Sequence, residues 1–187
     1  MALEIQGNRE KGGVTALDFS DRGRARVDAL SNLTSAHVSR DDGLTFNLIS
    51  HDATAAAGTH ICYLKNTSTT RDLYIDLLRV GNAETALWKV WSVTGTAAGG
   101  SALTPTNLNL KRGISAEVTA RGNDAITGLT QVSEIATVRC PSNDSRDIPL
   151  DDTLILGTDN AIAVEIDTDD GTPSIAEVLI RFYFLNK

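Results

Sequence analysis

The chain has 187 residues, of which 41% are hydrophobic and 22% charged, and a formal net charge of −7. This composition is typical of a globular domain, and the length suits one all-β sandwich without a second domain. The acidic balance opposes binding to nucleic-acid phosphates and anionic lipid, so we expect neither nucleic acid nor a membrane as a partner. Residues 1–13 lack the apolar core of a secretory signal, which predicts a soluble protein made in the cytoplasm.

The amino-terminal residues differ from the rest of the chain. Residues 1–33 contain four glycines and the basic run Arg22-Gly-Arg24-Ala-Arg26. We expect these residues to form an extended arm with little independent structure, followed by a β-sandwich domain over residues 34–187. Arginine forks pair bidentately with carboxylates, so Arg22, Arg24 and Arg26 are candidates for binding an acidic partner, and a solvated face is the alternative.

Apolar and polar residues alternate along most of the sandwich domain. This period of two predicts half-buried strands, clearest at 44–48, 161–167 and 176–184. Turn residues predict two hairpins, one joining 36–40 to 44–48 and one through residues 168–173. Further strands are expected at 59–65, 72–80, 86–94, 135–140 and 147–156. With roughly eight to ten strands and no amphipathic helix, we predict an antiparallel β-sandwich.

A segment rich in Gly, Ala, Thr and Asn interrupts the strand spacing at about residues 95–133. We expect one long loop insertion here, which is uncommon in a compact domain unless the loop carries function or is ordered by contacts. The adjacent basic residues Lys111 and Arg112 lie within it. They join the arginines of the arm as candidates for binding an acidic partner, again with a solvated face as the alternative.

Two strands, at 73–78 and 87–91, are apolar on both faces. Such a strand is central beneath a covering loop or lies at a subunit contact. Trp88 and Trp91 stand on one of them at positions that point to opposite faces. Burial of both in the core is one expectation, and an oligomer interface formed by these tryptophans is the other.

Asp167-Thr-Asp169-Asp170-Gly171 resembles a cation-binding cluster. An EF-hand loop starting at Asp167 would require Gly and Glu at its sixth and twelfth positions, where Thr172 and Val178 stand. The requirements of a turn explain the acidic and glycine residues, so we expect no metal here.

The remaining reactive side chains form no recognisable constellation. His37, His51 and His60 make no zinc motif, and Cys62 and Cys140 lie far apart without a CxxC pattern. We expect the two cysteines to be buried free thiols. No phosphate-binding loop or nucleophile motif is present. The sequence therefore predicts no cofactor and no enzymatic activity.

Several segments between about residues 60 and 185 combine strand-like and loop-like sequence in a similar way. They are Leu64-Lys-Asn-Thr-Ser-Thr-Thr-Arg-Asp-Leu-Tyr-Ile-Asp76, Trp88-Lys-Val-Trp-Ser-Val-Thr-Gly-Thr-Ala-Ala-Gly-Gly100, Thr104-Pro-Thr-Asn-Leu-Asn109, Ile148-Pro-Leu-Asp-Asp-Thr-Leu-Ile-Leu156 and Ala161-Ile-Ala-Val-Glu165. In these segments the chain resembles virion structural proteins of tailed bacteriophages.

That resemblance implies a jelly-roll or related β-sandwich on the capsid surface of the virion, commonly a trimeric decoration or cement protein that bridges neighbouring major capsid proteins. It supplies no active-site residues. The leading hypothesis is therefore a homotrimeric protein that binds the outside of a phage head, with the major capsid protein as its partner, and stabilises it. The first alternative is a tail or fibre module that binds host carbohydrate, and a weaker one is a β-sandwich hydrolase with residues from scattered loops.

Overall fold

A computed structural model of the protein describes residues 18–19, 25–26, 38–39, 42–123, 126–150, 153–169, 171 and 174–187. The chain divides into two compact units, Met1–Leu33 and Thr34–Lys187. In the first unit, β1 (Asp18–Phe19) pairs antiparallel with β2 (Ala25–Arg26). The rest of the expected arm lies outside the described residues.

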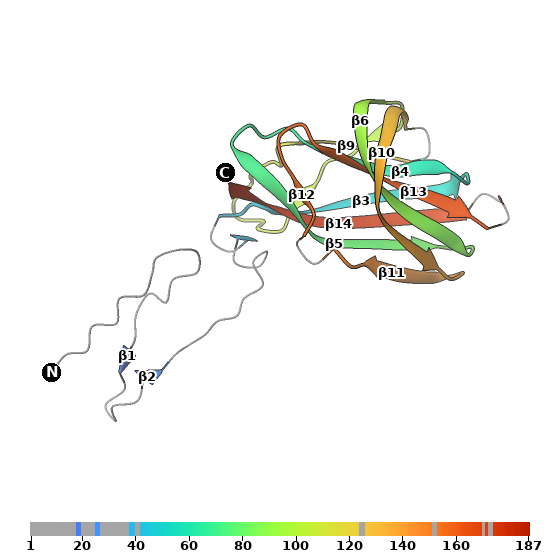
Figure 1. Ribbon diagram of the computed structural model, residues 1–187. Coiled ribbons are helices and arrows are strands. Elements are labelled where there is room, and N and C mark those ends of the chain that lie inside the picture. Colours follow the sequence, from blue (N-terminus) through green and yellow to red (C-terminus); the bar gives the residue numbers. More distant parts are fainter. Residues whose placement is uncertain are drawn as a thin grey trace. The chain divides into compact units, whose positions relative to one another are not determined.

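The second unit is a sandwich of two antiparallel six-stranded sheets (Figure 1). The first sheet contains, in spatial order, β10 (Thr127–Cys140), β6 (Ala86–Ala98), β13 (Ala161–Thr168), β4 (Thr59–Asn66), β9 (Val118–Gly122) and β7 (Ser101–Ala102). The second contains β11 (Asp144–Ile148), β5 (Arg71–Asn82), β14 (Ser174–Asn186), β3 (Thr45–Ala55) and β8 (Thr106–Asn107), with β12 (Ile155–Leu156) paired to β5. The predicted all-β sandwich is confirmed.

Four nested antiparallel pairs define the topology. They are β3 with β14, β4 with β13, β5 with β11 and β6 with β10. Successive pairs alternate between the two sheets, and contacts of β14 with β5 and of β13 with β6 join the pairs within each sheet. A long hairpin rolled up in this way is a jelly roll, the topology that the resemblance implied.

Both predicted hairpins are wrong in detail. β13 lies in the first sheet and β14 in the second, so the chain crosses between the sheets after Thr168. Such a crossing needs the same sharp reversal as a hairpin, and Gly171 adopts a φ of 72° within it. Of the strand expected at 36–40, residues 38–39 are helical instead. The Val38 carbonyl accepts hydrogen bonds from the N–H groups of Asp42 and Gly43.

Strands interrupt the long loop expected at 95–133. The end of β6 and the start of β10 occupy its two ends, and β7, β8 and β9 lie between them. β8 and β9 are short and pair with the long strands β3 and β4. Their weak β-propensity is sufficient because the neighbouring strand supplies the template. The longest irregular stretch that remains in the described part of this segment is residues 108–117, which we call the tip loop.

The main core fills the space between the two sheets. Phe46, Phe182 and Phe184 pack together with ring centroids 5.6 to 6.0 Å apart. Trp88 is fully buried, and its indole Nε1 donates a 2.7 Å hydrogen bond to the side-chain oxygen of Asn82. These contacts are those of a sandwich that is stabilised within a single chain.

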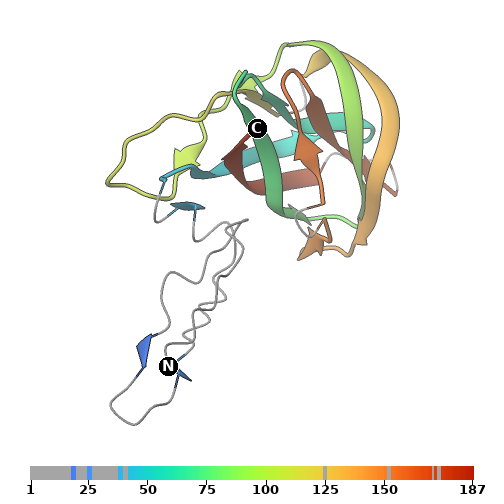
Figure 2. The same cartoon turned by 60° about the vertical axis from the view of Figure 1, so that its left-hand side comes forward.

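A second apolar cluster lies on the other face of the first sheet. Its members are Tyr63, Val93, Ala97, Ile126, Ala161 and Ala163, with Trp91 and Leu129 packed against them. Three register irregularities interrupt the pairing of β6 with β10, and such irregularities bend strands. Figure 2 shows these two long strands curving together around one side of the molecule. Because of this curvature, the sheet face that carries Ala163 is covered.

Candidate functional site

The tryptophans point to opposite faces of β6, as predicted. Trp88 is completely buried in the main core, so its assignment to an oligomer interface is wrong. Trp91 packs half-buried against the second cluster, and its indole N–H is buried without a hydrogen-bond partner. The sequence predicted that a loop or another subunit covers the second apolar face of this strand. In the structure, the curved strands β6 and β10 of the same chain provide most of that cover.

Two acidic residues, one at the end of β13 and one directly after it, form ion pairs with neighbouring cations. Asp167 lies 3.1 Å from the Lys89 ammonium, and Asp169 lies 2.8 Å from the Arg139 guanidinium. Asp170 lies outside the described residues. Among the described side chains, no group of three or more His, Cys, Asp and Glu residues is arranged to hold a metal ion. The carboxylates of Asp167 and Asp169 therefore serve surface ion pairs.

The cysteines are free and buried, as predicted. Burial raises the pKa of the Cys62 thiol to about 12, and burial also raises the pKa of Cys140. A thiol with a raised pKa is protonated at neutral pH and is a poor nucleophile. Both cysteines therefore belong to the hydrophobic interior.

A polar network links β10 to β13, β4 and β6 within the first sheet. The buried carboxylate of Glu165 lies 3.8 Å from His60 Nε2 and 3.5 Å from Lys89 Nζ, and it accepts a hydrogen bond from the Gln131 side chain. The Gln131 amide nitrogen is also 3.1 Å from His60 Nε2. Because an amide nitrogen only donates, this contact requires a neutral His60 that accepts through Nε2. Burial lowers the pKa of His60, which favours that neutral form, whereas Glu165 opposes the shift.

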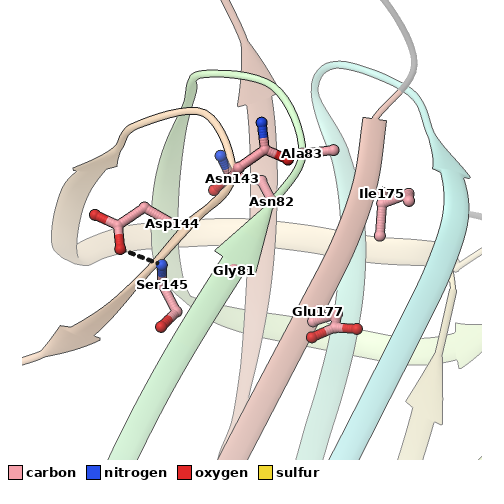
Figure 3. Close-up of a pocket in the computed structure, with 8 residues that line it drawn as sticks. All are labelled: Gly81, Asn82, Ala83, Asn143, Asp144, Ser145, Ile175 and Glu177. Carbon is pink, nitrogen blue, oxygen red and sulfur yellow. Dashed lines mark hydrogen bonds between the residues drawn. The ribbon is translucent and has the colours of Figure 1, made fainter.

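A polar pocket of about 410 Å³ opens where β5 and β14 lie beside the start of β11 (Figure 3). Its lining residues are Gly81, Asn82, Ala83, Asn143, Asp144, Ser145, Ile175 and Glu177. Asp144 pairs with Arg146 at 3.0 Å and accepts a hydrogen bond from the N–H of Ser145. The amide of Asn82 is used for the carbonyls of Cys140 and Pro141. The buried Asn82 of this pocket therefore stabilises the fold through these hydrogen bonds.

A second groove, of about 400 Å³, lies between the β6–β10 pair and residues 154–162. Val132 and Ile135 of β10 and Ile155 of β12 are exposed along it. The ion pair between Lys65 and Asp159 also contributes to its lining. The groove combines apolar and polar walls, and it is open to solvent.

The tip loop contains two of the predicted partner-binding residues. Lys111 and Arg112 are exposed there, directly after Leu110. Leu110 is 85% exposed and Leu108 is 40% exposed. The projecting segment drawn in yellow at the left of Figure 2 includes this loop. The structure thus adds two leucines to the cationic pair that the sequence singled out.

The remaining predicted partner-binding residues lie in the first unit. Arg22 and Arg24 are outside the described residues, and Arg26 lies in β2 with only its backbone described. Leu108 and Leu110 were not singled out from the sequence, because the sequence does not show whether a leucine in a loop is covered by distant segments. The signal available was their position between asparagines and the basic pair.

Comparison of the chain with models of protein families, with curated proteins and with solved structures finds no match. Within the described part of the chain, no helix combines the length and hydrophobicity that crossing a membrane requires.

Proposed function

We propose that this protein is a structural component of a bacteriophage particle, which binds the outside of the head and stabilises the shell. The observation that carries the proposal is the display of large aliphatic side chains on a well-packed jelly roll. The described part of the chain has seven exposed large aliphatic side chains: Ile49, Leu108, Leu110, Val132, Ile135, Ile155 and Ile175. Five of them gather in two places, Val132, Ile135 and Ile155 along the second groove and Leu108 and Leu110 in the tip loop, and such groups support contacts with other proteins.

The nested strand pairing supports a mechanical role. Each of the long strands β5, β6, β13 and β14 is hydrogen-bonded on both sides. Load on one strand is therefore shared with two neighbours and with the core beneath them. In this proposal the protein contributes stiffness and contact area, and catalysis has no part in it. A homotrimer would associate through a surface that does not include Trp88.

The number of copies in each particle tests the proposal. Quantitative mass spectrometry of purified phage particles should find this chain in a fixed, high ratio to the major capsid protein. Immunogold labelling should place it over the whole head surface. A handful of copies confined to the tail would contradict the proposal and favour a tail or fibre module.

The proposal also assigns an anchoring role to residues 1–33, on the capsid or on a neighbouring subunit. The main-core residues that the structure describes all lie at or after Val38, so the sandwich should fold without this segment. A protein that begins at Thr34 should show the unfolding transition of the full chain and should lose binding to heads that lack the protein. Binding at full strength would refute the anchoring role.

A further inference from the structure

The tip loop presents an apolar surface beside positive charge. Leu110 has the largest exposed fraction, 85%, of the exposed large hydrophobic residues in the described part of the chain. Leu108 and Leu110 are separated by a single residue, and Lys111 and Arg112 follow at once. A single exposed leucine is ordinary, but this combination is characteristic of protein contact sites, where apolar anchors lie beside arginine.

Two asparagines hold the loop in one conformation. The Asn107 amide donates to the carbonyls of Gly43 and Ile114 at 2.8 and 2.9 Å, and its oxygen accepts from the N–H of Asn109 at 2.8 Å. The Asn109 amide donates to the carbonyl of Ser39 at 2.7 Å. A loop ordered before binding loses little conformational entropy when a partner arrives. Leu108 and Leu110 therefore have a fixed position before a partner binds.

The stem of Arg112 is held closely as well. Gly43 has a φ of 67°, and a Cβ atom at this position would lie 2.6 Å from Arg112 Cγ. A residue with a side chain would meet both backbone strain and this contact. The absence of a side chain thus lets the backbone at Gly43 approach the tip loop. Hydrogen bonds from Asn107 to the Gly43 carbonyl and from Asn109 to the Ser39 carbonyl fasten this contact.

The charge of the tip loop contrasts with that of its domain. Residues 1–33 contain five basic and five acidic side chains, so the net charge of −7 belongs to residues 34–187. The sandwich as a whole therefore repels an acidic partner, whereas the exposed ammonium of Lys111 attracts one. Opposite charge at one spot orients the approach of such a partner and selects the face that docks.

We propose that the tip loop is the surface through which the sandwich docks on the shell, and that its partner is an acidic protein surface with an apolar recess. Leu110 enters the recess, and Lys111 pairs with a carboxylate at its rim. This inference rests on the proposed function and specifies the face and the partner chemistry. The strand residues Ile49 and Val132 are also exposed, but neither is followed by a pair of cations.

The experiment compares matched surface variants for binding to purified heads that lack this protein. Leu110→Asp and Lys111→Glu change the tip loop, and Ala53→Asp changes an exposed apolar residue of β3 that belongs to neither group of exposed aliphatic side chains. Co-sedimentation titrations give the dissociation constant of each full-length variant, and thermal unfolding checks that each is folded. We expect about tenfold or greater weakening for Leu110→Asp and Lys111→Glu, and less than about twofold for Ala53→Asp.

The outcomes distinguish the two proposals. If the unaltered protein fails to bind heads, the proposed function is wrong and the inference falls with it. If the unaltered protein binds and both tip-loop variants bind equally well, the function stands and the inference is wrong. A changed sedimentation coefficient of the free Leu110→Asp protein would show that the tip loop contacts a second copy, which also overturns the inference.

Discussion

Replacing Asn107 with alanine should loosen the tip loop without altering the side chains it displays. The change removes three hydrogen bonds, to Gly43, Ile114 and Asn109, all between 2.8 and 2.9 Å. A neutral hydrogen bond contributes about 1 kcal/mol net. Asn107 is half-buried, so water replaces part of what is lost. We expect the free energy of unfolding to fall by about 1–2 kcal/mol.

Urea denaturation followed by tryptophan fluorescence measures this loss, and hydrogen exchange locates it. Exchange at residues 108–114 should accelerate, while exchange in the central strand β14 should change much less. Asn186→Ala, at the exposed end of β14, is the matched control and should leave both measurements unchanged. Affinity for heads should also decrease, because the loop would then have to be ordered on binding.

Unchanged exchange at residues 108–114 in Asn107→Ala would refute the bracing of the loop. A loss of stability without faster exchange there would show that Asn107 stabilises the sandwich in another way. In either case the proposed rigid presentation of Leu110 would need to be abandoned.

Three further predictions concern the sandwich itself. The Asn82→Leu and Trp88→Phe variants should each lose about 1–3 kcal/mol of unfolding free energy, because each leaves a buried hydrogen-bond partner unsatisfied. The double variant should lose clearly less than the sum of the two losses, and additive losses would show that the two side chains are not coupled. Gly122→Ala should cost about 1–3 kcal/mol in urea denaturation, because its Cβ would lie 2.5 Å from Ser50 Oγ; an unaltered midpoint would show that the site adapts freely. Burial lowers the pKa of His60 below the value of about 6.5 in the unfolded chain, so the unfolded state takes up the proton first and stability should fall as the pH drops below about 6.5. His60→Gln should reduce this decline between pH 7.5 and 5, and an identical decline in the variant would exclude His60 as its source.

Local sequence features predicted much of the fold. The alternation at 176–184 identified the buried face of β14, where Val178, Ile180 and Phe182 are indeed buried. The spacing of Trp88 and Trp91 placed them on opposite faces. These predictions succeeded because the direction of side chains along a strand depends only on the backbone period of two.

The arrangement of the strands required the tertiary structure. The turn-forming residues at 168–173 are equally compatible with a hairpin and with a crossing between sheets. The sequence therefore could not assign β13 and β14 to different sheets. The short strands within 95–133 exist because β3 and β4 are already in place to pair with them. Composition alone indicated a loop, since Gly, Ala and Asn have weak strand propensity.

The candidate docking surface shows the same division. The sequence by itself determined the cationic pair Lys111 and Arg112, the acidic character of the domain and the alternation that builds its core. Only the tertiary structure decided that Trp88 is buried and that Leu110 is exposed. Exposure depends on which distant segments cover a side chain, and here the curved β6–β10 pair covers one sheet face while Asn107 and Asn109 hold the tip loop in place.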